Sequence, residues 1–173
     1  MRYLPLVGLY WKGAGQGSFK SGISYSTQPT DIPLGALSVE KDASRNVENI
    51  YEFVRISGTC TVGSLLYQTG TNNAYVVCTG TGAGKPYAIA MAAPTTSGSW
   101  QWAQKYGINS TIQVTNTFGG SAAGSGALYG GESAVQNFSA FITGTYSGAG
   151  GSLIGRSLTE TTGSTTIGFI ELL

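Results

Sequence analysis

The residue types that carry most enzymatic chemistry are scarce in this chain. Its 173 residues include no histidine, which is the usual general base beside a serine or cysteine nucleophile. Lys85 and Lys105 could take that role, but neither stands in a Ser-x-x-Lys arrangement. A pair of carboxylates could hydrolyse a glycoside, yet the acidic residues around position 45 are interspersed with basic ones, as on a solvated face of mixed charge. These residues are Glu40, Lys41, Asp42, Arg45, Glu48, Glu52 and Arg55. The sequence therefore predicts that the protein is not an enzyme.

The candidate metal and cofactor motifs fail on their details. The stretch 80–85, Gly-Thr-Gly-Ala-Gly-Lys, hints at a phosphate-binding loop, but Thr79 stands where the first glycine is required and Pro86 follows the lysine. Cys60 and Cys78 form no CxxC pair and have no histidine to complete a zinc site. The two cysteines either pair across neighbouring strands or stay reduced and buried. We expect no cofactor and no metal.

Two tryptophans offer a different kind of site. Trp100 and Trp102 alternate on one predicted strand, so their side chains share a face. Such a pair can be ordinary core, a sugar-stacking platform, or the lining of a subunit interface, where aromatic residues are enriched. Core packing is the most frequent of the three, and both residues are also candidates for contact between subunits.

Most of the chain shows the period-two pattern of short β-strands separated by Gly, Asn and Pro turns. The segment 51–56, Tyr-Glu-Phe-Val-Arg-Ile, is rich in β-branched and aromatic residues. The predicted strands are 51–56, 59–62, 64–68, 74–79, 86–91, 99–104, 111–114, 138–143 and 165–170. Strands of this length and spacing predict an all-β fold, either a small β-barrel or a sandwich.

Two segments fall outside the predicted barrel or sandwich. Residues 1–36 are rich in glycine, and we interpret them as an extended N-terminal arm ahead of a single β-rich domain at 37–173. An arm of this composition cannot form a core alone, so its large apolar residues need a surface on which to dock. Those nearest its start are Leu4, Leu6, Leu9, Tyr10 and Trp11. Residues 117–133 form a long Gly-rich loop insertion, and such loops are usually either functional or disordered.

Charge is sparse and unevenly placed. Charged residues make up 10% of the chain, against about 25% in ordinary soluble domains, and between Ile56 and Gly155 they are only Lys85, Lys105 and Glu132. Such a surface indicates cover by copies of the chain or by a partner, although Thr, Ser, Asn and Gln could also solvate it. The basic residues are scattered, which argues against nucleic acid. No apolar stretch approaches the roughly 20 residues of a spanning helix, so we expect no membrane association.

The middle of the chain has a characteristic order of elements. A strand, Val-Arg-Ile-Ser-Gly-Thr-Cys-Thr-Val-Gly, begins at Val54 and is followed by a short strand, the Ala-rich strand Ala-Ile-Ala-Met-Ala-Ala, a turn, and a Trp-Gln strand that ends at Gly107. This order resembles that of the head decoration, or cement, proteins of tailed bacteriophages, and Gln101, Trp102 and Gly107 match its residue types. The resemblance covers residues 54–114 and leaves the arm and the Gly-rich loop without a counterpart.

The resemblance implies a homotrimer on the outer surface of a capsid, at or near local threefold axes. There it would clamp neighbouring copies of the major capsid protein against the pressure of internal DNA, after synthesis in the host cytoplasm. The arm, Leu4 to Trp11, would dock on a neighbour, and the Gly-rich loop would reach capsid or solvent. Two other classes stay open. One is a glycan- or receptor-binding module of a tail fibre or adhesin, with Trp100 and Trp102 as stacking residues, and the other is a different virion component such as a tail or connector protein.

Overall fold

The protein is all-β, as its sequence predicts. The structure is a computed structural model, and every regular element in the part of the chain that it describes is a strand. The described residues are 10–11, 22–58, 60–68, 75–77, 85–93, 98–118, 127–130, 135–138, 152–158 and 165–172.

The strands form one hydrogen-bonded sheet, and most neighbours in it are antiparallel. Their bounds are β1 Tyr10–Trp11, β2 Ser24–Tyr25, β3 Leu37–Asp42, β4 Val47–Ser57, β5 Leu65–Gln68, β6 Tyr75–Val77, β7 Lys85–Ala90, β8 Ser99–Phe118, β9 Ala127–Gly130, β10 Val135–Phe138, β11 Ser152–Ser157 and β12 Thr165–Glu171.

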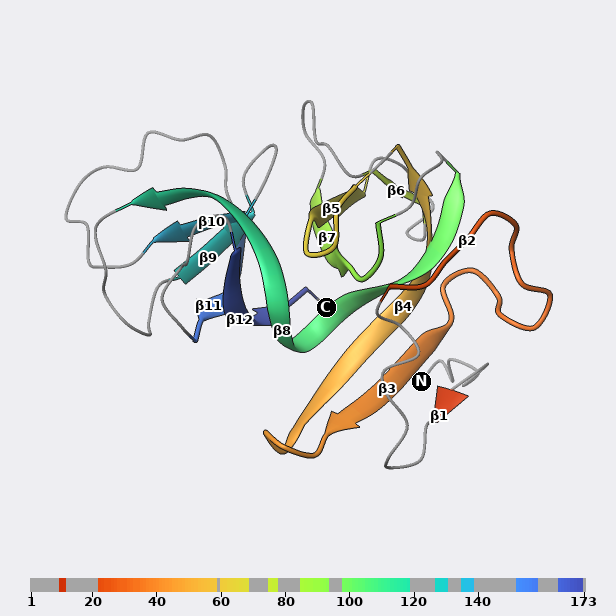
Figure 1. Ribbon diagram of the computed structural model, residues 1–173, viewed down its shortest axis with the longest axis horizontal. Coiled ribbons are helices and arrows are strands. Elements are labelled where there is room, and N and C mark those ends of the chain that lie inside the picture. Colours follow the sequence, from red (N-terminus) through yellow and green to blue (C-terminus); the bar gives the residue numbers. More distant parts are fainter. Residues whose placement is uncertain are drawn as a thin grey trace, which may run out of the picture.

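Strand β8 is the long element that both halves of the molecule share (Figure 1). Its first half pairs with β4 and β7, and β6 and β5 connect those two strands, so the pairing returns to β8. Its second half pairs with β12 and β10, and β9 and β11 connect those in the same way. In the first half, two of these pairings are short, with three residue pairs between β4 and β6 and two between β7 and β8. We therefore describe two curled half-sheets joined along β8.

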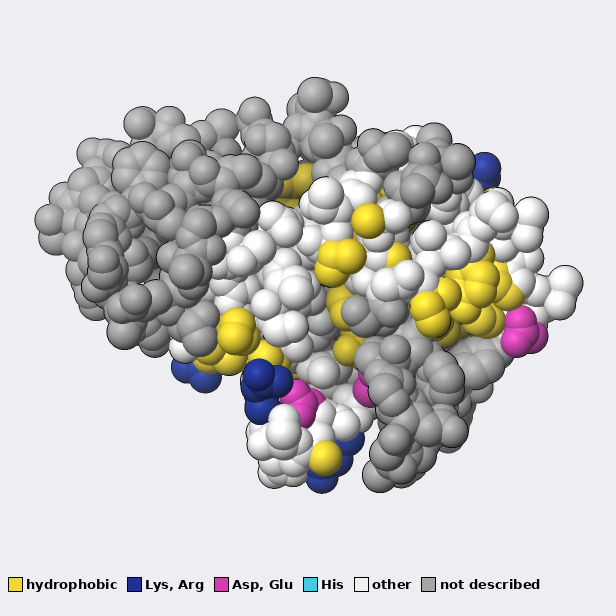
Figure 2. Space-filling model, viewed as in Figure 1, with side chains coloured by type: hydrophobic (Ala, Val, Ile, Leu, Met, Phe, Trp, Pro, Cys, Tyr) yellow, Lys and Arg dark blue, Asp and Glu magenta, His cyan; other side chains and the backbone are white. Residues whose placement is uncertain are grey.

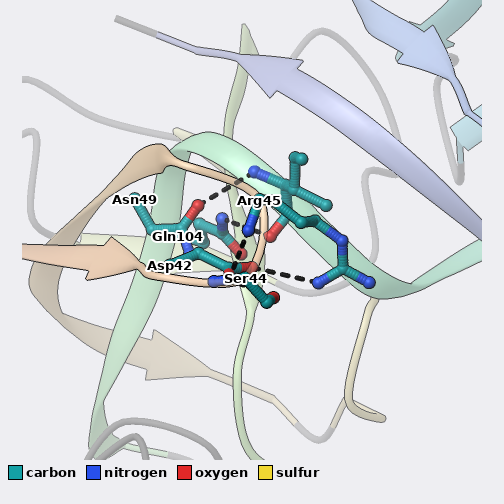
Figure 3. Close-up of polar contacts among 6 residues, drawn as sticks. Asp42, Ser44, Arg45, Asn49 and Gln104 are labelled. Atoms are coloured by element: carbon teal, nitrogen blue, oxygen red, sulfur yellow. Dashed lines mark hydrogen bonds and ion pairs between the residues drawn. The ribbon is translucent and has the colours of Figure 1, made fainter.

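Strand β8 curves where its two halves meet, and Gly107 lies at that point. Its φ of 103° is one that residues with a side chain rarely adopt, and a Cβ there would lie 2.7 Å from the carbonyl oxygen of Glu48. The Asn49 side chain accepts a hydrogen bond from the Ile108 amide at 2.9 Å, and the Gln104 side chain donates to the Ile108 carbonyl at 3.1 Å (Figure 3). The turn of β8 is thus fixed by a glycine and by two buried amide side chains.

Three apolar clusters hold the sheet together. The first lies between β4, β5, β7 and β8 in the first half-sheet, and the third lies on the opposite side of β4 and β8. The second joins the halves, because it packs side chains of β5 and β7 against those of β8, β9, β11 and β12. Its members are Leu65, Tyr67, Ile89, Ile112, Leu128, Ile154, Ile170 and Leu172. The two half-sheets therefore share a core.

Several predicted elements differ from the observed ones. The strands predicted at 99–104 and 111–114 are one continuous strand, β8. The segment 117–133, interpreted as a loop insertion, contains β9, whose Leu128 is fully buried. Residues 59–62, predicted as a strand, lead instead into a turn closed by the Ser64 amide on the Thr61 carbonyl. Strands β1, β2, β3 and β11 are absent from the predicted strands. The continuous β8 depends on pairing with residues far apart in the chain, which local periodicity does not record, whereas β3 pairs with the neighbouring strand β4 in a hairpin.

Candidate interaction face

The segment 22–36, which the sequence analysis assigned to the arm, lies on the sheet and covers its third apolar cluster. At one end the Gly22 amide donates to the Met91 carbonyl at 2.8 Å. At the other end the Gly35 amide donates to the Phe53 carbonyl, and the Phe53 amide donates to the Ala36 carbonyl, both at 2.8 Å. The segment is thereby attached by its backbone at both ends. This part of the predicted arm packs on its own domain.

The rings of Tyr25, Phe53 and Trp102 contact one another in turn at this segment. Strand β2 adds to β8 with Tyr25 opposite Trp100. Tyr25 meets Phe53 edge to face, with ring centroids 5.9 Å apart, and Phe53 meets Trp102 in the same way at 5.3 Å. Ile32 also packs against the cluster. Edge-to-face contacts of this kind contribute about 0.5–1.5 kcal/mol each beyond the apolar area they bury.

Part of this layer reaches the surface, and we call it the apolar face: Ile23, Tyr25, Ile32 and Trp100. Ile23 is 37% exposed, and the other three are only partly buried. Hydrophobic side chains gather on the side of the molecule where β2 and the β2–β3 connection lie (Figure 2). The guanidinium carbon of Arg55 lies 5.0 Å from the centre of the Trp100 ring, within cation–π range. Tryptophan, tyrosine and arginine are the residue types that dominate binding energy in protein interfaces.

The structure separates the two tryptophans singled out in the sequence. Both pack on the same side of the sheet, as the alternation predicts. Trp102 is 4% exposed and belongs to the core, whereas Trp100 keeps part of its surface. A sugar-stacking platform in this chain would therefore rest on Trp100 without Trp102.

The remaining predicted contact residues belong to the start of the arm. Leu4, Leu6 and Leu9 lie outside the described residues. Tyr10 and Trp11 form β1, which pairs in parallel with β3 of the same chain, at Ser38 and Val39. That the arm docks on a neighbouring chain stays a prediction.

Sequence reasoning missed Ile23, Ile32 and Arg55 as members of this surface. A signal was present in the prolines of the segment: the Ile32 amide bonds to the Pro29 carbonyl and the Ala36 amide to the Pro33 carbonyl. These two turns fold the segment back over the sheet, so that Ile32 packs against the cluster on β4 and β8. Which apolar residues would be covered and which exposed depends on that packing and not on the local pattern.

A polar cluster occupies the other side of β4. The Tyr87 hydroxyl donates to Oε1 of Glu52 at 2.6 Å, and the Lys105 ammonium lies 3.4 Å from Oε2 of Glu52. The same ammonium lies 3.7 Å from the centre of the Tyr87 ring. Burial, then the hydrogen bond to Glu52 and its negative charge, raise the pKa of Tyr87 far above its ordinary value. Both carboxylate oxygens of Glu52 are engaged, so the fold itself supplies the partners of this buried charge.

This cluster corrects one prediction. Glu52 was expected on a solvated face of mixed charge, but it is 8% exposed. The other charged residues of β3 and of the β3–β4 turn do lie toward the surface, and charged side chains are visible around that hairpin in Figure 2. Glu52 differs because it faces the first half-sheet, where Lys105 and Tyr87 offset the cost of burying its charge.

Asp42 organises the turn of that hairpin. Its Oδ1 accepts hydrogen bonds from the Ser44 amide and hydroxyl, and its Oδ2 pairs with the Arg45 guanidinium at 3.0 Å (Figure 3). The Ser44 hydroxyl and then Arg45 lower the pKa of Asp42 to about 2. The turn passes through Asn46, which has a φ of 52°.

Two other kinds of site are absent from the part of the chain that the structure describes. Within the described ranges, no three residues among His, Cys, Asp and Glu are grouped so that they could hold a metal ion. In the same ranges there is no helix of the length and hydropathy needed to cross a membrane.

Comparison with known proteins gave no match. No protein-family model, no curated protein and no solved structure is significantly similar to this chain.

Proposed function

We propose that the protein is a virion structural protein, a decoration protein that binds the outer surface of a capsid, associates with copies of itself and stabilises the shell. The observation that carries the proposal is the apolar face, a surface of Trp, Tyr and Ile with Arg55 stacked on Trp100. Exposed clusters of this composition mark sites of protein association. The low charge of the chain supports the same reading, because a surface with few charges is suited to cover by other protein.

The residues that match the decoration-protein pattern have structural roles in this chain. The Gln101 side chain accepts hydrogen bonds from the Met91 and Ala92 amides, at 3.0 and 2.8 Å, and donates to the Ala92 carbonyl at 3.2 Å. It thereby holds the end of β7 against β8. Trp102 fills the core beneath the segment 22–36, and Gly107 permits the bend of β8. The pattern therefore consists of residues that build a fold, as expected for a structural protein.

Co-sedimentation with capsids tests the proposal. The chain is produced together with the major capsid protein of its own genome, and particles are separated from free protein on a gradient. We expect the wild type in the particle fraction. Wild-type protein that stays free beside intact capsids would overturn the proposal.

A matched pair of variants tests the role of the apolar face. Ile23→Asp places a charge on that face, and a hot-spot loss of about 2 kcal/mol corresponds to roughly 30-fold weaker binding. The control, Ala43→Asp, adds the same charge at the exposed turn of the β3–β4 hairpin and should bind like the wild type. Equal occupancy of the two variants would remove the apolar face from the mechanism.

A further inference from the structure

The outer edge of β3 is a docking edge for an extended strand. On one side β3 pairs with β4 at all six of its residues, from Leu37 to Asp42. On the other side it receives β1 in parallel, with Tyr10 opposite Ser38 and Trp11 opposite Val39. Leu37, next to this pairing, is 46% exposed, more than any other large apolar side chain of the described residues.

The attachment of β1 to its own chain is small. It involves two residue pairs, whereas an average strand has about 5–6 residues. Each backbone hydrogen bond contributes a net of only about 0.5–1.5 kcal/mol, and fixing the backbone of each arm residue costs about 1–2 kcal/mol. The free energy gained by the backbone hydrogen bonds and the cost of ordering the arm residues are therefore similar in size. The pairing itself does not favour β3 of the same chain over β3 of another copy.

The length of the connection between β1 and Gly22 does not restrict β1 to its own chain either. Gly22 is held on Met91 by its backbone, and ten residues, 12–21, separate it from Trp11. A chain of ten residues spans at most about 33–36 Å. A β3 edge of a second copy that lies within that distance can receive the same pairing without any new kind of contact, as in other exchanges of an element between identical chains.

We propose that Tyr10–Trp11 pairs with β3 of a second copy when the protein associates, and that the pairing within one chain is the closed form of the same contact. This inference rests on the self-association in the proposed function and names its contact. It also reconciles the expected docking of the arm on a neighbour with the pairing seen in the single chain.

Disulfide crosslinking between two differently substituted copies tests the exchange. In a background of Cys60→Ala and Cys78→Ala, one copy carries Trp11→Cys and the other carries Val39→Cys. Neighbouring strands lie about 4.8 Å apart, within the Cα separation of about 4.4–6.8 Å that a disulfide allows. After oxidation of the mixture, at a concentration where the native mass shows an oligomer, we expect a crosslinked dimer on a non-reducing gel.

The control moves the second cysteine out of register. Trp11→Cys mixed with Lys41→Cys, two positions further along β3, should give little dimer. A third chain carries both Trp11→Cys and Val39→Cys. If it closes a disulfide within itself and the mixture of the two singly substituted copies yields no dimer, the exchange is wrong. A protein that stays monomeric at every concentration tested also overturns it. Should Val39→Cys not fold, Tyr10→Cys with Ser38→Cys tests the adjacent register pair in the same way.

The outcome separates this inference from the proposed function. Capsid binding without a crosslink rejects the exchange and leaves the decoration role intact. A crosslink in a protein that does not bind capsids supports the exchange and rejects the decoration role.

Discussion

The two sides of the strand pair β4 and β8 are covered in different ways. On one side Val54 and Ile56 pack with Leu66, Ala88 and Ala103, and the cover consists of β5 and β7, strands of the same sheet. On the other side Phe53 and Trp102 are covered by the irregular segment 22–36, which is attached by its backbone at both ends. Alternate residues of β4 therefore face β5 and β7 on one side and the segment 22–36, which we call the strap, on the other.

This difference shows where the molecule can offer a surface to a partner. A strand that closes a curled sheet satisfies its backbone groups through the ladder and buries one face fully. A strap covers less and leaves parts of its own side chains and of its neighbours in solvent, as at Ile23 and Trp100. We infer that the sheet-covered side serves stability and that the strap-covered side serves both stability and association.

The largest expected effect tests whether the strap side contains true core. Phe53 is fully buried, and Phe53→Ala should lower the free energy of unfolding by about 3–5 kcal/mol, since it removes a ring and leaves a cavity. Urea unfolding measures the change. Ile23→Ala, on the exposed part of the same side, should stay within about 0.5 kcal/mol of the wild type. Equal losses for both variants would mean that the side is uniformly core and offers no surface.

A smaller effect at alkaline pH tests the polar cluster on the sheet-covered side. Because the pKa of Tyr87 is raised in the folded protein, its contribution to stability is complete below the unfolded value of about 10 and is lost as pH rises above it. Tyr87→Phe should therefore flatten the fall in unfolding free energy above about pH 10. Glu52→Gln removes the charge that helps to raise this pKa, so the same fall should be shallower than in the wild type. An unchanged alkaline profile in both variants would contradict the assignment.

The smallest effect is expected at the turn of the β3–β4 hairpin, away from both sides. The pKa of Asp42 is lowered to about 2 in the folded protein, so its contribution is present above the unfolded value of about 4 and is lost as pH falls toward 2. Because the turn is largely exposed, that contribution is no more than about 1 kcal/mol. Asp42→Asn should remove this part of the acid dependence in thermal melts between about pH 4 and 2. A loss as large as that of Phe53→Ala would show that the hairpin belongs to the core.

Local composition and periodicity were sufficient to predict the fold class and the position of several strands. Residues 51–56 and 165–170 were recognised because alternation and β-branched composition are local properties, and they lie within β4 and β12. The alternation of Trp100 with Trp102 also predicts that both side chains lie on the same side of the sheet, as they do. The low content of charged residues is likewise evident from the sequence alone.

The pairing of the strands, the residues that the strap covers and the positions of the buried charges depend on long-range packing. Glu52 and Lys105 are 53 residues apart in the chain, and the pairing of β4 with β8 brings them to the same side of the sheet. The Gly-rich residues around Leu128 form strand β9 because β10 and β11 pair with it on either side. Local composition carries no record of such distant partners, because a strand gains its hydrogen bonds from a neighbour and not from itself.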